Sequence, residues 1–311
     1  MAGWNASDIP DRGGRTAVVT GANSGLGYIT ARELARRGAR VVLACRSETR
    51  GTEAGERIAA EVPGADVEFQ RLDLGDLDSV REFAAGYERA CDRLDLLVNN
   101  AGVMALPPGR TADGFETQFG VNHLGHFALT GLLLPALLGT PGARVVTVSS
   151  MVHALANIDI EDLNSERGPY RKWIAYARSK TANLLFTHEL ARRLADIGSD
   201  VVAAAAHPGY ASTNLQTAGP KLEGRKGAER FMEIGNRVFA QSAEAGALPS
   251  LYAATAPDVR PDAFIGPSFA MWRGSPGKSW RAGWTVNDTA AERLWVASER
   301  LTGVTYDALK V

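Results

Sequence analysis

The stretch 20-TGANSGLGYIT-30 places three glycines between a short run of strand-forming apolar residues and a run of helix formers. Glycine adopts positive φ and lets a backbone approach another group closely, so Gly21, Gly25 and Gly27 indicate a tight turn between a strand and a helix. The N-terminus of a helix is also a favourable place for an anion. Taken alone, this stretch leaves two interpretations open, a phosphate-binding loop or a turn without a ligand.

Apolar strand-like runs alternate with longer helical patterns along the chain. The expected strands are 16–20, 40–45, 67–70, 94–99, 144–149 and 201–206, and the expected helices are 28–38, 48–61, 77–91, 115–139, 173–197 and 243–255. Regular alternation predicts a parallel sheet with helices on both faces, and the uniformly apolar strands fit burial on both sides. We therefore expect an α/β fold, with residues 1–311 forming a single Rossmann-like, doubly wound domain of about seven strands.

Two segments, 207–240 and 256–286, break this alternation. The first is rich in proline and glycine at its start, and long irregular segments in compact domains are usually functional covers or disordered. We expect 207–240 to form a substrate lid and 256–311 to form a C-terminal extension.

Polar residues follow four successive strands. They are Asp73-Leu74, Asn99-Asn100-Ala101-Gly102, Ser149-Ser150 and His207-Pro208-Gly209. In doubly wound sheets, ligands bind beyond the carboxyl ends of the strands, near the point where the strand order reverses. Any one of these groups could be an ordinary turn, but four in succession favour a ligand-binding edge.

Composition excludes several classes of function. The chain has 311 residues and a formal net charge of −1, with no long basic block to attract nucleic acid or an anionic membrane. Its only cysteines, Cys45 and Cys91, cannot form a disulfide framework. The N-terminal stretch 1–15 is polar and without the apolar core typical of a signal peptide, and the apolar run 127–139 is too short to span a bilayer. We expect a cytoplasmic protein without a nucleic-acid partner or membrane span, and the sequence allows a homo-oligomer.

A resemblance to the short-chain dehydrogenase/reductase family is carried by four motifs together. They are Thr20-Gly21-x-x-x-Gly25-x-Gly27, Asn99-Asn100-Ala101-Gly102, Ser150 and Tyr176-x-x-x-Lys180. The stretches 41-VVLACR-46, 121-VNHLGHF-127 and 207-HPGYASTNL-215 are similar to its retinol-dehydrogenase-like branch. The resemblance covers roughly 15–255. It implies a nicotinamide-dependent oxidoreductase that interconverts a small lipophilic ketone or aldehyde and its alcohol.

The resemblance also implies which residues act. The catalytic residues would be Asn122, Ser150, Tyr176 and Lys180, with Asn122 positioning Lys180 through a water. The cofactor would be bound by Gly21, Asn23, Ser24, Gly25, Leu26, Gly27, Arg46, Ser47, Asp73, Leu74, Asn100, Ala101, Gly102, Tyr176, Lys180, Pro208, Gly209 and Thr213. The gap between Ser150 and Tyr176 is longer than in most of the family, and we expect the extra residues, 153–172, at the rim of the pocket.

Physical chemistry supports part of this assignment. Tyr176 and Lys180 are four residues apart on an expected helix and therefore share one face. A nearby ammonium favours the phenolate, so we expect a lowered Tyr176 pKa and a role as general acid and base. Ser150 could hydrogen-bond a carbonyl oxygen that gains negative charge. The competing Ser149 should face the opposite way, because neighbouring strand residues alternate.

The residues after the second expected strand indicate the dinucleotide. An acidic side chain there binds the ribose 2′-hydroxyl of NAD, whereas an arginine can accommodate the 2′-phosphate of NADP. This chain has Cys45, Arg46 and Ser47 at that point, with no carboxylate before Glu48. The sequence predicts NADP(H), with Asn23 and Ser24 helping to hold the phosphate. The alternative is that Arg46 is an exposed turn residue.

Two other functions have weaker support. The spacing of His123 and His126 could place two imidazoles on one helix face, but a zinc site needs three or four converging ligands, so we expect no metal. No G-x-S-x-G motif suggests a hydrolase. A protein that binds NADP(H) as a sensor or interaction module without turnover is the main alternative to an enzyme.

Overall fold

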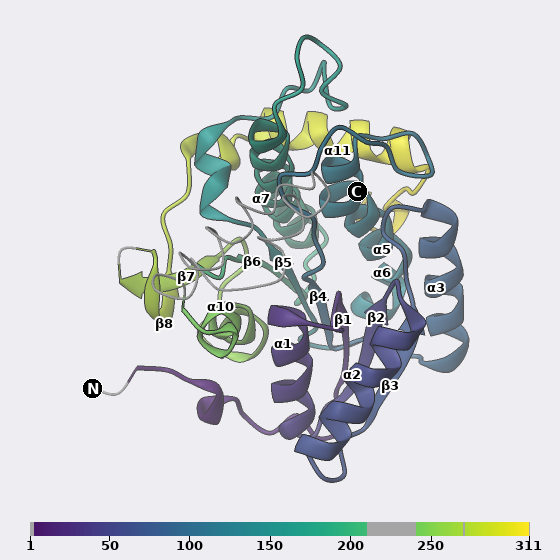
Figure 1. Cartoon of the computed structure of the whole chain (residues 1–311), viewed down its shortest axis with the longest axis vertical. Coiled ribbons are helices and arrows are strands. Elements are labelled where there is room, and N and C mark those ends of the chain that lie inside the picture. Colours follow the sequence, from purple (N-terminus) through teal and green to yellow (C-terminus); the bar gives the residue numbers. More distant parts are fainter. Residues whose placement is uncertain (1–2, 210–240, 270, 311) are drawn as a thin grey trace, which may run out of the picture.

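The computed structural model describes residues 3–209, 241–269 and 271–310 (Figure 1). Among them, eight strands form one sheet in the order β3-β2-β1-β4-β5-β6-β7-β8. The strands are β1 Thr16–Thr20, β2 Arg40–Cys45, β3 Val67–Arg71, β4 Leu96–Asn99, β5 Arg144–Val148, β6 Val202–Ala206, β7 Phe264–Phe269 and β8 Arg273–Lys278. All neighbours pair in parallel except β7 and β8. The predicted doubly wound α/β fold is confirmed, with one strand more than expected.

Helices cover both faces of this sheet. One face carries α1 Gly25–Arg36, α2 Glu48–Glu61 and α10 Ala243–Thr255, and the other carries α3 Leu77–Ala90, α5 Gly125–Leu132, α7 Lys172–Asp196 and α11 Asp288–Thr302. Side chains of one strand alternate between the two cores: Val18 packs with the α3 and α7 side, whereas Ala17 and Val19 pack with the α1 and α10 side. This two-sided burial explains why the strands are apolar throughout.

Shorter helical elements complete the described fold. They are η1 Ala6–Asp8, α4 Thr117–Phe119, the π-helical turn η2 Gly120–Leu124, α6 Leu134–Leu138, η3 Met151–Leu155, η4 Gly283–Val286 and η5 Asp307–Leu309. The single helix expected over 115–139 is therefore wrong, because a π-helical turn and the proline at the start of α6 divide it.

The strand order reverses between β1 and β4. β1 pairs with β2 on one side and with β4 on the other, so the carboxyl ends of these parallel strands lie along one edge of the sheet. Loops that follow β1 and β4 face each other at this switch point. The fold thereby brings the glycine stretch close to Asn100 and its neighbours.

Several expected boundaries shift in the structure. The first helix begins at Gly25 rather than at 28, so two of the three glycines belong to its first turn. β3 ends one residue later than expected, β4 and β6 begin two residues and one residue later, and β5 ends one residue earlier. Segment 256–286 is not irregular throughout, because it contains β7, β8 and η4.

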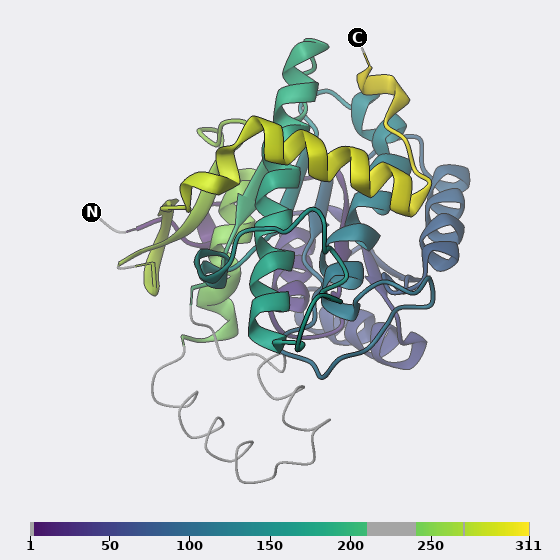
Figure 2. The same ribbon diagram turned by 90° about the horizontal axis from the view of Figure 1, so that it is seen from above.

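The C-terminal extension packs against the helices that carry the site. Helix α11 crosses α7 on one face of the sheet (Figure 2). Trp295 of α11 lies 5.1 Å from Phe127 and 5.8 Å from Phe186 between ring centroids, and the Tyr306 hydroxyl donates to the Phe127 carbonyl at 2.6 Å. This aromatic cluster anchors α5 and α7.

The expected lid falls largely outside the described residues. Residues 210–240, including Thr213, are not among them, so the lid stays a prediction. In the part of the chain that is described, none of the helices combines the length and the apolar character needed to cross a bilayer.

Candidate active site

The glycine loop between β1 and α1 is closely packed. Gly21 and Gly25 have φ of 66° and 56°, which favours glycine at both positions. A Cβ on Gly27 would lie 2.5 Å from the side-chain nitrogen of Asn100 and 2.5 Å from the Gly21 carbonyl oxygen. Gly27 is thus required for close packing of the helix on the loop, whereas the positive φ values of Gly21 and Gly25 allow the turn.

At the start of α1, the half-buried residues have backbone N–H groups that can bind an anion. The N-cap residue Ser24 makes no side-chain capping hydrogen bond to the helix. Asn23, Ser24, Gly25 and Leu26 are all partly exposed at the switch point. A helix N-terminus of this kind fits a phosphate group, so the residues present fit a dinucleotide.

Thr20 joins the glycine loop to the loop after β4. Its hydroxyl oxygen accepts hydrogen bonds from the amides of Asn100 and Ala101, both at 2.9 Å. The Asn100 side chain donates to the Thr20 carbonyl at 2.8 Å. His126 Nδ1 donates to the Asn122 carbonyl at 3.0 Å, so its Nε2 can accept from the Thr20 hydroxyl at 2.9 Å.

Thr20 and His126 are thus structural members of the site to which the sequence motifs assigned no role, although Thr20 begins the glycine motif. Burial lowers the pKa of His126 to about 4, which keeps it neutral and suited to this arrangement. For His126 the sequence signal was the stretch 121-VNHLGHF-127.

The structure brings Ser150 and Tyr176 together from two elements. Ser150 follows β5, and its hydroxyl oxygen accepts the Val152 amide at 3.2 Å, which leaves its proton free to donate. Tyr176 lies in the first half of α7, is 4% exposed and lies near enough to Ser150 for the serine side chain to lower its pKa. Ser149 faces away, donating its hydroxyl to the Lys180 carbonyl at 2.8 Å.

Lys180 lies one turn beyond Tyr176 on α7. Its ammonium is 5.7 Å from the centre of the Tyr176 ring and donates to the Val148 carbonyl at 3.0 Å. It is 3% exposed, and burial lowers its pKa to about 8. Gly102 faces the same ammonium, because a Cβ there would lie 3.5 Å from the Lys180 nitrogen.

The expected lowering of the Tyr176 pKa is wrong for this structure. Burial raises the pKa of Tyr176 to about 12, and the Ser150 side chain only partly opposes this rise. Removing the phenol from water disfavours its charged form. Tyr176 is therefore held as a neutral phenol, the form that donates a proton.

Asn122 lies in the π-helical turn, where its side chain is fully engaged. Its oxygen accepts the Val103 amide at 2.8 Å, and its nitrogen donates to the Val103 carbonyl and to the Ser179 hydroxyl, both at 2.9 Å. Ser179 in turn donates to the Tyr176 carbonyl at 2.8 Å. Asn122 therefore connects the loop after β4 to the helix that carries Tyr176 and Lys180.

The residues after β2 are accessible at the same edge. Arg46 has a 72% exposed side chain and lies 4.0 Å from an oxygen of Asp73, while the Ser47 hydroxyl caps α2. Burial raises the pKa of the Cys45 thiol to about 11, although the backbone groups of Ala22 and Asn23 act to lower it. The end of β2 therefore contacts the glycine loop directly.

Leu74 and Pro208-Gly209 border the site more distantly. Leu74 is buried beneath α5, where a Cβ on Gly125 would lie 2.4 Å from the Leu74 carbonyl oxygen. Gly209 has φ of 65° and faces the Trp272 carbonyl, which a Cβ would approach to 2.3 Å.

The histidines do not converge on a metal. His123 Nε2 bonds with the Ser298 hydroxyl at 2.9 Å, whereas His126 faces Thr20. Among residues 3–209, 241–269 and 271–310, no group of three or more His, Cys, Asp or Glu side chains is placed to hold a metal ion.

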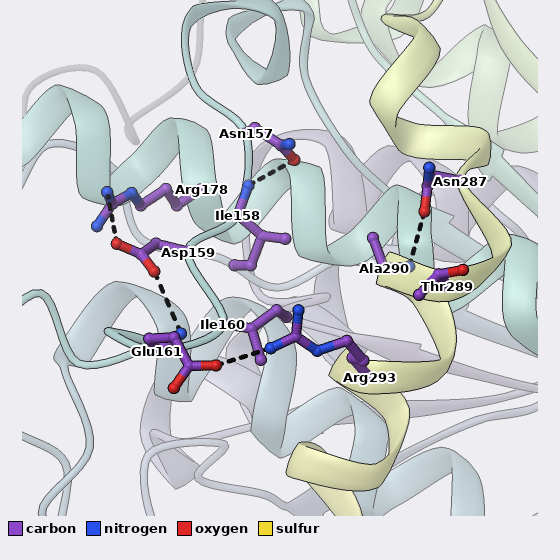
Figure 3. Close-up of a pocket in the computed structure, with 10 residues that line it drawn as sticks. All are labelled: Asn157, Ile158, Asp159, Ile160, Glu161, Arg178, Asn287, Thr289, Ala290 and Arg293. Atoms are coloured by element: carbon purple, nitrogen blue, oxygen red, sulfur yellow. Dashed lines mark hydrogen bonds and ion pairs between the residues drawn. The ribbon is translucent and has the colours of Figure 1, made fainter.

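A recess of about 440 Å³ lies beside part of the 153–172 segment (Figure 3). It is lined by Asn157, Ile158, Asp159, Ile160, Glu161, Arg178, Asn287, Thr289, Ala290 and Arg293. Its charges pair with one another, Arg178 with Asp159 at 3.7 Å and Arg293 with Glu161 at 2.7 Å. This recess contains none of the predicted catalytic residues.

His188 fastens α7 to its neighbours, and we expect this contact to make stability depend on pH. Its two ring nitrogens bond with Asp262 and Asp288, each at 2.8 Å, and these bonds, chiefly that with Asp262, raise its pKa above 6.5. Because the pKa of His188 is higher in the folded than in the unfolded state, its protonation stabilises the fold. This contribution is complete at a pH below the unfolded-state pKa and is lost as the pH rises through the folded-state pKa. The Tm deficit of His188→Gln should therefore be larger at about pH 6 than at about pH 9. Thermal unfolding measures it, and a deficit independent of pH would contradict the charged pairing.

Comparison with known proteins agrees with this geometry. The family model described as short chain dehydrogenase matches residues 15–222. The chain is 42% identical over 294 residues to retinol dehydrogenase 12 of Homo sapiens, covering 94% of this chain and 88% of that protein. A crystal structure of an uncharacterised protein from Mycobacterium paratuberculosis is 46% identical with a TM-score of 0.80, covering 98% of this chain and 99% of that one.

A structure from Beutenbergia cavernae, named as an NAD(P)-dependent gluconate 5-dehydrogenase with bound NADP, is 30% identical with a TM-score of 0.59. It covers 79% of this chain and 91% of that chain. The chain described here belongs to the short-chain dehydrogenase/reductase family of NAD(P)-dependent oxidoreductases, in its retinol-dehydrogenase-like branch.

Proposed function

We propose that the protein is an NADP(H)-dependent reductase or dehydrogenase that interconverts a lipophilic ketone or aldehyde and its alcohol. The observation that carries the proposal is the meeting of Ser150, Tyr176 and Lys180 at one end of the sheet, with the Ser150 side chain acting on the Tyr176 pKa and the Lys180 ammonium 5.7 Å from the tyrosine ring. These groups lie at the sheet edge where doubly wound folds bind ligands.

The residues have distinct roles in the proposed reaction. When bound, the reduced nicotinamide supplies the hydride. The Ser150 hydroxyl donates to the carbonyl oxygen as negative charge develops on it, and Tyr176 delivers the proton that completes the alcohol. In the reverse direction Tyr176 accepts that proton. Lys180 supplies positive charge beside Tyr176 and holds the ribose, while Asn122 keeps α7 in register with the loop after β4.

Two exposed apolar side chains, one in contact with Tyr176 and one five residues after Ser150 in the chain, support a lipophilic substrate. Trp173 lies one turn before Tyr176, with 6.2 Å between ring centroids, and is 40% exposed. Leu155, in the turn that follows Ser150, is 64% exposed. Large exposed apolar side chains beside polar reactive groups are typical of pockets for apolar ligands. The names of the relatives add retinal to the carbonyls worth testing.

The proposal is tested by loss of NADPH absorbance with retinal and with a panel of aromatic and aliphatic ketones and aldehydes. We expect turnover with at least one lipophilic carbonyl, and Ser150→Ala should lower kcat about 10²- to 10³-fold, as for a lost oxyanion donor. Full turnover in Ser150→Ala would remove serine from the reaction.

Arg46 is expected to select NADP(H) over NAD(H). Within the described residues, its exposed guanidinium has one long contact, with Asp73 at 4.0 Å, so it is available to a 2′-phosphate. A charge-assisted hydrogen bond of this kind is worth about 1.5–3 kcal/mol, roughly ten- to a hundredfold in affinity. Arg46→Ala should weaken NADPH binding by this factor and leave NADH binding unchanged.

Titration of both cofactors by fluorescence or calorimetry measures the preference. The double variant Cys45→Asp with Arg46→Ala should lose the preference for NADPH, because it offers a carboxylate in place of the cation. Equal dissociation constants for NADH and NADPH in the unmodified protein would disprove NADP(H) selectivity without affecting the hydride chemistry.

A further inference from the structure

His153 connects the residue after β5 to the C-terminal extension through a defined tautomer. The Ala282 amide donates to His153 Nε2 at 3.1 Å, so Nε2 must be unprotonated. The proton of the neutral ring therefore lies on Nδ1, which donates to the Ser150 carbonyl at 2.7 Å. Burial lowers the pKa of His153, which favours this neutral form.

Ser150 needs this support because the sheet ladder ends just before it. The Ser149 amide still bonds with the Ala206 carbonyl, but Ser150 lies beyond the last strand residue. In the described part of the chain, the Ser150 carbonyl accepts only from the backbone amide and Nδ1 of His153. The histidine ring thus helps to hold the backbone of the residue that carries the Ser150 hydroxyl.

The His153 ring and the Ala282 end of this connection are held in place by neighbouring residues. His153 is fully buried, and its ring lies 5.7 Å from the ring of Phe264 in β7 and 5.9 Å from that of Trp280. Arg281 makes two hydrogen bonds with Asp262, which fixes the backbone just before Ala282. A side chain clamped between fixed partners can hold a neighbouring reactive group in place.

We propose that His153 is a positioning residue for Ser150, with the Ala282 amide selecting the tautomer that holds the serine. The inference rests on the proposed function, in which Ser150 polarises the substrate carbonyl. It gives the C-terminal extension a part in catalysis although Ala282 is 129 residues from His153 in the chain. The histidine does not touch the reacting atoms.

A matched pair of substitutions separates positioning from stability. In His153→Asn the amide nitrogen can take the place of Nδ1 and donate to Ser150, but the Ala282 amide loses its acceptor. In His153→Gln the side-chain oxygen can reach the place of Nε2 and accept from Ala282, but Ser150 loses its side-chain donor. An unpaired buried amide is costly, whereas the Ser150 carbonyl keeps its backbone bond, so His153→Asn should have the lower Tm.

The order of kcat should be the reverse. We expect His153→Gln and His153→Ala to lower kcat about 10- to 100-fold, because a small displacement of a reacting group is costly. His153→Asn should recover most of that loss despite its lower Tm. If kcat follows Tm, or if all three variants keep full kcat while Ser150→Ala does not, His153 has no positioning role and the proposed function still stands.

Nitrogen NMR of the imidazole tests the hydrogen bonds of His153 with Ser150 and Ala282 by a measurement that does not depend on turnover. Protein labelled with ¹⁵N at histidine should show at least two rings with protonated Nδ1 and bare Nε2, those of His126 and His153, and one of these signals should disappear in His153→Asn. If the signal lost in His153→Asn is that of a ring protonated at Nε2, the inference is overturned. Failure of the unmodified enzyme to reduce any carbonyl, with this tautomer present, would overturn the proposed function and with it the catalytic role of the clamp.

Discussion

Tyr176→Phe is expected to lower kcat about 10²- to 10⁴-fold, the loss typical of a removed general acid. The variant deletes one hydroxyl and keeps the ring that packs against Trp173. Burial holds Tyr176 as a neutral phenol, with a pKa of about 12, so the hydroxyl is a ready proton donor to the developing alcohol. Dissociation constants for NADPH should change little, since Lys180 and the glycine loop remain.

Tyr87→Phe provides the matched control. The Tyr87 hydroxyl is also buried and donates to the Arg93 carbonyl at 2.7 Å, but it lies in α3, away from the catalytic group. Its loss should lower Tm by an amount typical of a buried hydrogen bond and leave kcat unchanged. Steady-state kinetics with NADPH and an accepted carbonyl compares the two variants. Full turnover in Tyr176→Phe would assign the proton to another group.

Lys180→Ala should damage both cofactor binding and turnover. Its buried ammonium lies beside the Tyr176 ring and faces Gly102, so its loss removes the positive charge shared by the phenol and the proposed ribose site. We expect kcat to fall about 10²- to 10³-fold, as when a preorganised charge is removed. The dissociation constant for NADPH should rise about tenfold or more, consistent with a lost charged hydrogen bond.

Asn183→Ala separates the charge from the local packing. The Asn183 side chain donates to the same Val148 carbonyl as Lys180, at 3.1 Å against 3.0 Å. Its loss should lower Tm without the combined loss of affinity and kcat. If Asn183→Ala reproduces the Lys180→Ala kinetics, the contribution of Lys180 is structural. If Lys180→Ala keeps normal NADPH affinity, Lys180 does not hold the cofactor.

The strand pattern and the meeting of the candidate reactive residues at one edge of the sheet could be predicted because their signals are local. Apolar runs mark the parallel strands, glycine spacing marks the first turn, and Tyr176 and Lys180 are one helical turn apart. The pKa of Tyr176 could not be predicted, since it depends on burial by residues distant in the chain.

The last two strands could not be predicted for a related reason. Their segment contains Pro267, Pro276 and several glycines, which are typical of loops, yet an edge hairpin tolerates them. The π-helical turn was also hidden, because residues 115–139 have a helical pattern throughout. There the Asn122 side chain bonds with the Val103 backbone, a contact that no local pattern reveals.

Transfer of deuterium tests the central claim most directly. The protein is incubated with NADPH deuterated at nicotinamide C4, in separate samples for each face of the ring, and with a lipophilic aldehyde or ketone that it accepts. Mass spectrometry should find one deuterium on the carbinol carbon of the alcohol from one of the two samples, and almost none with Tyr176→Phe. Tight NADPH binding without deuterated alcohol from any carbonyl of the panel would contradict the account and favour a cofactor-binding sensor.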